Sequence, residues 1–167
     1  EECVMCEKHL LTDGTQYLVE KAFRTYKGRQ VKDTVFEYAI CLDCRDKMHT
    51  KLSEQSKESL NAYFAKHFNP HQRVNDYKDK SIHERIEHCL IDKEKHSDGG
   101  EFQIYGYCDG GDIILDVMPY MIRGEAMDVI IQLISSKSLD ELNGFMKENF
   151  TGPPEFKEIL DGPRVFL

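Results

Sequence analysis

The motifs CVMC (residues 3–6) and CLDC (residues 41–44) decide how this sequence is interpreted. Two thiolates separated by two residues can bind one metal ion from a tight turn, and two such pairs supply the four ligands of a tetrahedral Zn²⁺ site. If Cys3, Cys6, Cys41 and Cys44 fill all four positions, none remains for a water molecule or a substrate. The spacing therefore predicts a structural zinc ion that takes no part in catalysis.

Other uses of these cysteines stay open at the level of sequence. Rubredoxin-like iron uses the same ligands, but Glu7 and Arg45 stand where knuckles of that kind carry glycine. Redox dithiols or disulfides would need an oxidising compartment or a thioredoxin-like context, and neither is evident. A histidine is a further candidate ligand in place of one cysteine, because His9 and His49 each lie a few residues from a pair.

The residues between the two pairs have the pattern of a β-hairpin. Residues 16–23 and 34–40 are rich in strand-forming side chains, and Gly28 supplies a turn residue between them. After Cys44 the apolar residues recur with helical spacing until Asn69-Pro70. Serines interrupt the middle of this stripe, so the pattern allows either one helix or two shorter ones.

Knuckle, hairpin and a second cysteine pair entering a helix follow the order found in treble-clef and zinc-ribbon-like modules. Over about residues 1–60 the chain resembles that fold group, through Cys3, Cys6, Cys41 and Cys44 and the order of elements. The resemblance implies a bound metal. It implies no particular function, because such modules occur in nucleases, adaptors, ribosomal proteins and ubiquitin ligases.

The second half of the sequence predicts a small α+β unit. Ser81 and Glu84 form a capping box that starts a helix, whose apolar face would include Ile82, Ile86, Cys89 and Leu90. Residues 101–108 alternate like a strand.

A β-hairpin and a helical hairpin are expected after that strand. The turn at residues 109–112 contains Asp-Gly-Gly and would lead into a second strand over 113–117. A helix over 125–135 has an apolar stripe wide enough to be largely buried, and a capping box at Ser138-Leu139-Asp140-Glu141 would open the next helix. The apolar tail, residues 163–167, is expected to dock on the sheet or on a partner subunit.

The remaining cysteines and nearby histidines suggest a second metal site as one alternative. Its members would come from Cys89, Cys108, His83, His88 and His96. Periodicity instead places both cysteines on apolar faces, where a free cysteine behaves as a small buried hydrophobe. Core packing is therefore the favoured interpretation of the two cysteines.

Charge is distributed unevenly, and this supports a division into a zinc module (residues 1–70) and an acidic α+β domain (residues 71–167). The net charge is −8, of which residues 101–167 contribute −7, while residues 1–70 are neutral. Within the neutral part a basic run has no acid between its members and is the candidate contact for an anion or a nucleic acid: Lys21, Arg24, Lys27, Arg29 and Lys32. The acidity of the rest opposes binding to a phosphate backbone.

No catalytic motif is recognisable, and no apolar stretch is long enough to cross a membrane. The leading hypothesis is a cytoplasmic, zinc-stabilised binding or adaptor protein that acts on another macromolecule, with protein as the expected partner. One alternative is nucleic-acid binding through the basic hairpin 21–32. Another is an enzyme of unidentified chemistry in the groove between the two halves.

Overall fold

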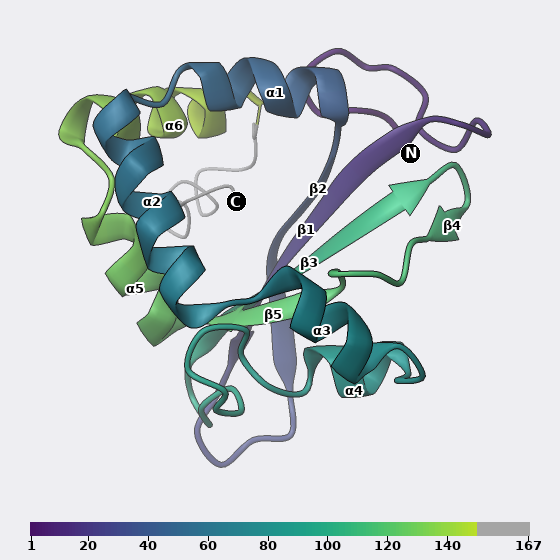
Figure 1. The fold of residues 1–167 in the computed structure, drawn as a ribbon, viewed down its shortest axis with the longest axis vertical. Coiled ribbons are helices and arrows are strands. Elements are labelled where there is room, and N and C mark those ends of the chain that lie inside the picture. The colour runs from purple at the N-terminus through teal and green to yellow at the C-terminus, as the bar shows by residue number, and fades with distance from the viewer. Residues whose placement is uncertain (150–167) are drawn as a thin grey trace.

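A five-stranded antiparallel sheet forms the centre of the molecule, and helices pack to one side of it (Figure 1). A computed structural model describes residues 1–149. The elements are β1 (Gln16–Thr25), β2 (Lys32–Cys41), α1 (Leu42–Thr50), α2 (Glu54–His67), α3 (Pro70–Tyr77), α4 (Ile82–Ile86), β3 (Glu101–Asp109), β4 (Asp112–Ile113), β5 (Tyr120–Arg123), α5 (Gly124–Gln132) and α6 (Ser136–Asn149). The α+β character expected from the sequence is confirmed.

The β1–β2 hairpin has the position that the sequence predicts. Its strands pair antiparallel from Tyr17–Cys41 to Thr25–Lys32, and Gly28 in the turn has a φ of 70°, which glycine adopts without the strain of a β-carbon. The long helical stripe after the second cysteine pair is divided into α1 and α2, so the interruption by serines marks a real break.

Strand β3 joins the two halves of the sequence in one sheet. It pairs with β1 from Gln16–Asp109 to Arg24–Glu101, and its other edge carries β4 and β5. The sheet is thus continuous across residue 70, where the sequence suggested a domain boundary. The hairpin after β3 is shorter than expected, because β4 contains only Asp112 and Ile113.

The helices α1, α2, α5 and α6 cover the face of the sheet that carries Glu20, Ala22, Tyr38 and Tyr105 (Figure 1). Tyr38 of β2 meets Phe145 of α6 edge-on, with ring centroids 6.4 Å apart. On the opposite face, Phe23 and Phe102 stack across β1 and β3 at 5.2 Å. Apolar side chains are therefore buried on both faces of the sheet.

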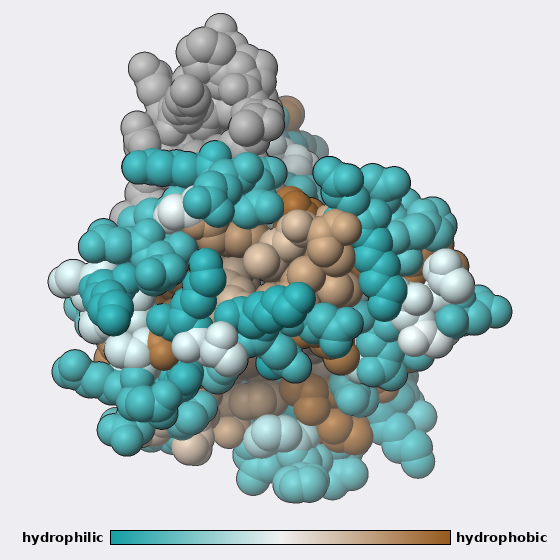
Figure 2. Space-filling model, turned by 90° about the horizontal axis from the view of Figure 1, so that it is seen from above, coloured by the Kyte–Doolittle hydropathy of each residue, from teal (hydrophilic) through white to brown (hydrophobic). Residues whose placement is uncertain are grey.

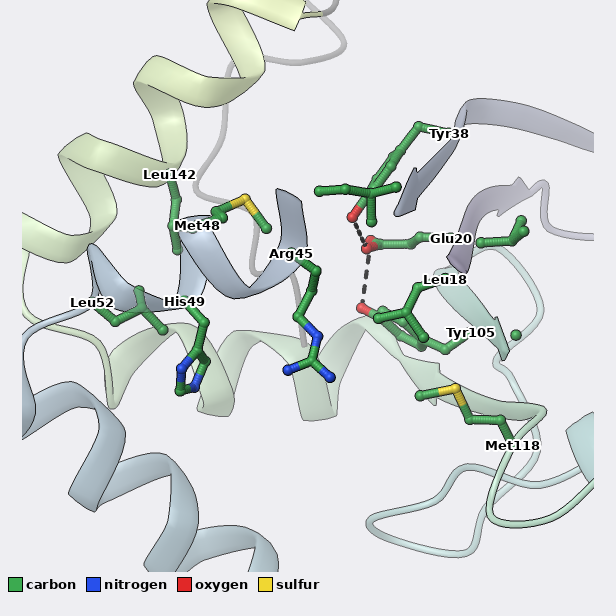
Figure 3. Close-up of a pocket in the computed structure, with 13 residues that line it drawn as sticks. Leu18, Glu20, Tyr38, Arg45, Met48, His49, Leu52, Tyr105, Met118 and Leu142 are labelled. Atoms are coloured by element: carbon green, nitrogen blue, oxygen red, sulfur yellow. Dashed lines mark hydrogen bonds between the residues drawn. The ribbon is translucent and has the colours of Figure 1, made fainter. Parts of the chain in front are cut away.

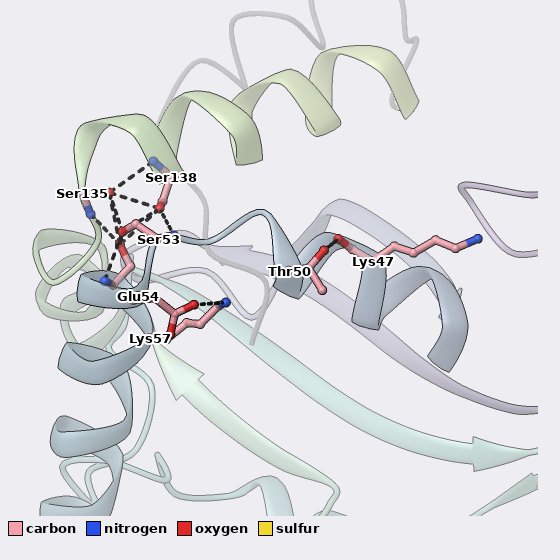
Figure 4. Close-up of polar contacts among 8 residues, drawn as sticks. Lys47, Thr50, Ser53, Glu54, Lys57, Ser135 and Ser138 are labelled. Atoms are coloured by element: carbon pink, nitrogen blue, oxygen red, sulfur yellow. Dashed lines mark hydrogen bonds and ion pairs between the residues drawn. The ribbon is translucent and has the colours of Figure 1, made fainter.

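Four serines join the beginnings of α2 and α6 in a reciprocal arrangement (Figure 4). Ser53 Oγ accepts from the Ser56 N–H, and Ser135 Oγ accepts from the Ser138 N–H, so each helix has its own serine cap. Each cap residue also donates its N–H to the other helix, Ser53 to Ser138 Oγ at 2.9 Å and Ser135 to Ser56 Oγ at 3.0 Å. Ser56 and Ser138 are fully buried.

This junction corrects the capping box that the sequence suggested at Ser138. The helix begins at Ser136, and Ser135 accepts the hydrogen bond that a cap accepts. Ser138 lies inside the first turn, where its hydroxyl serves the neighbouring helix. Local sequence cannot distinguish the two serines, because the choice depends on the contact with α2.

The capping box of Ser81 and Glu84 is confirmed, and Cys89 and Leu90 are buried as expected, but the helix ends at Ile86 and the burial expected for Ile82 is wrong. Ile82 is 43 % exposed, whereas Arg85 is 1 % exposed. The Arg85 guanidinium donates to the carbonyls of Tyr77, Asp116 and Met118, among others. These hydrogen bonds satisfy a buried cation that an apolar pattern could not predict.

A second buried arginine holds the same segment of chain. Arg73 of α3 donates through Nε to the Val117 carbonyl at 2.8 Å and through Nη2 to the Pro119 carbonyl at 2.9 Å. Together, Arg73 and Arg85 bind four consecutive carbonyls, those of residues 116–119, and so fix the approach to β5. Neither α3 nor this contact was predicted from the local sequence pattern.

Two further observations bear on the sequence predictions. No helix within residues 1–149 is both long and apolar enough to cross a membrane. The docking predicted for the tail at residues 163–167 lies outside the described residues.

Candidate metal centre and cavity

The first cysteine pair lies in a knuckle held by backbone hydrogen bonds. The Cys3 N–H donates to the Lys8 carbonyl, and the Glu7 N–H donates to the Cys3 carbonyl, both at 2.9 Å. Glu7 has a φ of 59°, which lets the chain reverse directly after Cys6. The Val4 N–H donates to the Ala39 carbonyl at 2.9 Å, and this bond attaches the knuckle to β2 close to the second pair.

The second pair lies where β2 becomes α1. Cys41 ends the strand and is the N-cap residue of the helix, with extended backbone angles, and Cys44 lies in the first turn. The Cys41 N–H points at Cys3 Sγ, 3.4 Å away. The strand end thus brings a cysteine and an amide donor to the sulfurs of the knuckle.

The four sulfurs converge on one point. All four Sγ atoms lie within 4.8 Å of one another, and Cys6 Sγ is 3.9 Å from Cys41 Sγ. Four sulfurs at the usual zinc distance in a tetrahedron are about 3.8 Å apart, so a small contraction completes the coordination shell. Cys3, Cys41 and Cys44 are buried, Cys6 is exposed, and all four are free thiols. The donor set fits a zinc ion.

The electrostatics of the cluster also fit a cation. Burial opposes ionisation of Cys3, but hydrogen bonds from the backbone of Cys41, Met5 and Cys6 outweigh it and lower its pKa to about 7. Burial, together with the neighbouring thiols, raises the pKa of Cys44. The thiolate form of Cys3 is therefore easier to reach than that of an ordinary cysteine, and four thiolates together need a positive ion between them.

Comparisons of this chain with protein-family models, curated proteins and solved structures find no match. The knuckle, hairpin and helix occur in the order typical of a treble clef. That likeness therefore rests on the cysteine positions and the element order alone.

The structure places the basic residues along the hairpin without bringing them to one point. Lys21 pairs with Glu37, and Arg24 pairs with Glu101 through Nε at 2.8 Å. Lys32 lies over the ring of Phe23, with Nζ 4.7 Å from the centroid. The other two members, Lys27 and Arg29, are exposed at the turn.

The two cysteines outside the cluster, Cys89 and Cys108, are buried or partly buried in the fold. Cys89 is 1 % exposed, and Cys108 is partly buried on β3. Burial raises the pKa of both thiols. Within residues 1–149, the only group of three or more side chains suited to a metal ion is that of Cys3, Cys6, Cys41 and Cys44.

A cavity of about 230 Å³ lies between α1 and the sheet, where the two halves of the sequence meet (Figure 3). Glu20, 3 % exposed, accepts from the Tyr38 hydroxyl at 2.5 Å. The Tyr105 hydroxyl lies 3.4 Å from the Glu20 carboxyl group and has a closer acceptor in Gln103 Oε1, at 2.6 Å. Burial, and next the charge of Glu20, raises the pKa of both tyrosines, which keeps both hydroxyls protonated as donors.

Sequence reasoning did not identify this polar group. Glu20 interrupts a run of strand formers, and the register of the hairpin places it opposite Tyr38. That pairing was the one available signal. The contribution of Tyr105 depends on β3 joining the hairpin, which local sequence does not show.

Proposed function

We propose that this protein is a zinc-stabilised binding protein, in which Cys3, Cys6, Cys41 and Cys44 hold one structural Zn²⁺. The observation that carries the proposal is the convergence of four free thiols within 4.8 Å. A four-thiolate shell leaves no open position, so the metal would stabilise the fold without acting on a substrate. Free thiols are typical of a reducing compartment, and we propose the cytoplasm as the location.

Replacement of the exposed ligand tests the metal site most cleanly. Because Cys6 is exposed, Cys6→Ser removes a ligand without opening a hole in the core. We expect the wild-type chain to contain one zinc per molecule and the variant to contain less zinc and melt at a lower temperature. Metal analysis and calorimetry measure both quantities.

The matched control is Cys108→Ser, which changes a cysteine outside the cluster. It should keep one zinc per chain. Wild-type protein without metal, purified in the absence of chelator, would contradict the proposal. So would a Cys6→Ser variant that retained full zinc content and wild-type melting.

Action on another macromolecule is the second part of the proposal, with protein as the partner. Figure 2 shows hydrophobic residues exposed in the middle of one face and bordered by hydrophilic ones, an arrangement typical of interaction surfaces. Ile113, in β4, and Leu115, just after it, are also large exposed hydrophobic residues. The acidic charge of residues 101–167 would favour a partner with a basic surface.

Nucleic-acid binding has less support. Lys21 and Arg24 are already paired with carboxylates, which reduces the charge available for phosphate groups. We therefore expect weak retention of RNA and DNA in a filter-binding assay. Tight retention with a steep loss on adding salt would reverse this preference, because phosphate contacts release counterions.

A further inference from the structure

The cavity between α1 and the sheet has an apolar interior with few polar groups. Its apolar lining comes from both halves of the sequence: Leu18, Ile40, Met48, Leu52, Met118 and Leu142. A volume of about 230 Å³ is at the small end for ligand pockets, which suits a molecule smaller than a typical drug. Size and lining together favour a compact apolar ligand.

Two basic side chains of one helix line this cavity while remaining partly open to solvent. Arg45 and His49 are one turn apart on α1, and both line the space beside Met48 and Leu52 (Figure 3). They face the sheet, where Glu20 and its two tyrosines form the opposite wall. A ligand would therefore have a cationic wall on one side and an anionic wall on the other.

The guanidinium of Arg45 has an unused edge. Its Nη1 atom pairs with Asp46 at 3.0 Å, outside the hydrophobic part of the cavity. Its Nε atom is buried and, within residues 1–149, is the one buried side-chain nitrogen or oxygen without a hydrogen-bond partner. Nε and Nη2 together form the edge of a guanidinium that binds both oxygens of a carboxylate.

We propose that this cavity binds a small monocarboxylate with an apolar body, whose carboxylate pairs with the guanidinium of Arg45 where that side chain lines the cavity. The apolar body would occupy the space among Leu18, Met48 and Leu142. The ligand carries a single carboxylate, because Arg45 is the one guanidinium among the residues that line this cavity. This site is separate from the metal proposal, which concerns the sulfur cluster alone.

Titration of the full chain with 4-methylpentanoate tests the proposal. The probe has a branched apolar body and one carboxylate, and 4-methyl-1-pentanol has the same body without the charge. Chemical shifts followed by NMR should show saturable binding of the acid, with the largest changes on α1, β1 and the Arg45 Nε–H signal. The alcohol should bind roughly tenfold more weakly or worse, since a charge-assisted hydrogen bond contributes at least that factor.

Arg45→Met tests the residue, because it keeps an apolar chain of similar length and removes every donor. It should weaken binding of the acid by roughly tenfold and leave binding of the alcohol unchanged. Arg29→Met is the matched control, since Arg29 is an exposed arginine at the hairpin turn. It should bind both probes as the wild type does.

Three results would overturn the proposal: no saturable binding of the acid to the wild-type chain, equal affinity for acid and alcohol, or an unchanged affinity for the acid in folded Arg45→Met. The first two need no variant, so they decide the question even if Arg45→Met does not fold. Succinate should bind more weakly than 4-methylpentanoate, and tighter binding of the diacid would also count against the site.

Discussion

Glu20 lies in the middle of the sheet, where its carboxylate is buried between two phenols. Tyr38 on β2 and Tyr105 on β3 stand directly opposite it on the two neighbouring strands. A buried carboxyl group is tolerated when a donor satisfies it, and the Tyr38 hydroxyl is the close donor here, at 2.5 Å. The group is a polar cluster inside the layer that would otherwise be apolar.

Replacement of Tyr38 should change how stability depends on pH. Burial, followed by the charge of Glu20, raises the folded-state pKa of Tyr38 well above 10. In the wild type this stabilisation is complete below about pH 10. Above that pH the tyrosine ionises first in the unfolded chain, so the free energy of unfolding falls by up to about 1.4 kcal/mol per pH unit. Tyr38→Phe should be less stable at pH 7 by about 1–3 kcal/mol.

Because the phenylalanine cannot ionise, the stability difference between wild type and Tyr38→Phe should shrink as pH rises from 9 to 11. Denaturant unfolding at a series of pH values measures this difference. Tyr26, a half-buried tyrosine whose hydroxyl donates to the exposed Asp33, provides the control, and Tyr26→Phe should have a small effect at pH 7. A constant difference at all pH values would show that Tyr38 does not contribute through its proton.

The buried serine hydroxyls are a second residue-scale feature with a measurable effect. Ser138→Ala leaves the Ser53 N–H without its acceptor at the junction of α2 and α6. We expect a loss of about 1–3 kcal/mol in the free energy of unfolding. Ser59→Ala, on the same stretch of helix but outside the serine cluster, should change stability by less than about 0.5 kcal/mol.

At the level of elements, two buried arginines attach α3 and α4 to the segment that leads into β5. Helix α3 and helix α4 each contribute one guanidinium, and both donate to the backbone that leads into β5. The helices are therefore attached to the sheet by charge-assisted hydrogen bonds to carbonyl groups. Such bonds are roughly twice as strong as neutral ones.

Arg85→Met should loosen this attachment. The change leaves the carbonyls of Tyr77, Asp116 and Met118 without their donor and should destabilise the protein by about 3 kcal/mol or more. Hydrogen exchange should rise most over residues 77–86 and 116–123. Faster exchange spread evenly over the sheet, or no change in melting, would contradict this role. The exposed Arg29→Met is again the control.

How far the sequence predicts each element depends on how local its cause is. The β1–β2 hairpin and the Ser81 capping box follow from alternation, a glycine and a serine–glutamate pair, and all of these act over a few residues. The start of α6, the burial of Arg85 and the shortness of β4 depend on segments far away in the chain. No local pattern contains that information.

The same distinction applies to the candidate site. The two Cys-x-x-Cys pairs predict a tetrahedral set of sulfur ligands from the sequence alone, and the four sulfurs lie close together in the structure. The cavity is different, since its lining comes from three strands and two helices. Arg45 and His49 look like ordinary surface residues of α1 until the sheet is placed beneath them.

At the level of the whole molecule, the sheet links both halves of the chain. Strand β1 has β2 on one side and β3 on the other, so the halves share hydrogen bonds along nine register pairs. We therefore expect one thermal transition, with equal calorimetric and van't Hoff enthalpies. In a fragment of residues 1–70 the hairpin should not be stable even with zinc, because β1 would lose its pairing with β3.

Circular dichroism of that fragment with zinc, beside the full chain as control, provides the measurement. Two separate transitions in the full chain, or a folded fragment with native-like melting, would show that the halves are independent. Either result would support the division at residue 70 that charge distribution suggests.

The pairing of β1 with β3 also has a consequence for the speed of folding. β1 and β2 are neighbours in sequence, so their hairpin can form by closing a short turn. Phe23 pairs with Phe102, which lies far from it in the sequence, and closing so long a loop costs entropy and slows folding. The hairpin should thus form early, with the sulfur cluster at its base. Entry of β3 along the far edge of β1 should then be the slow step of folding.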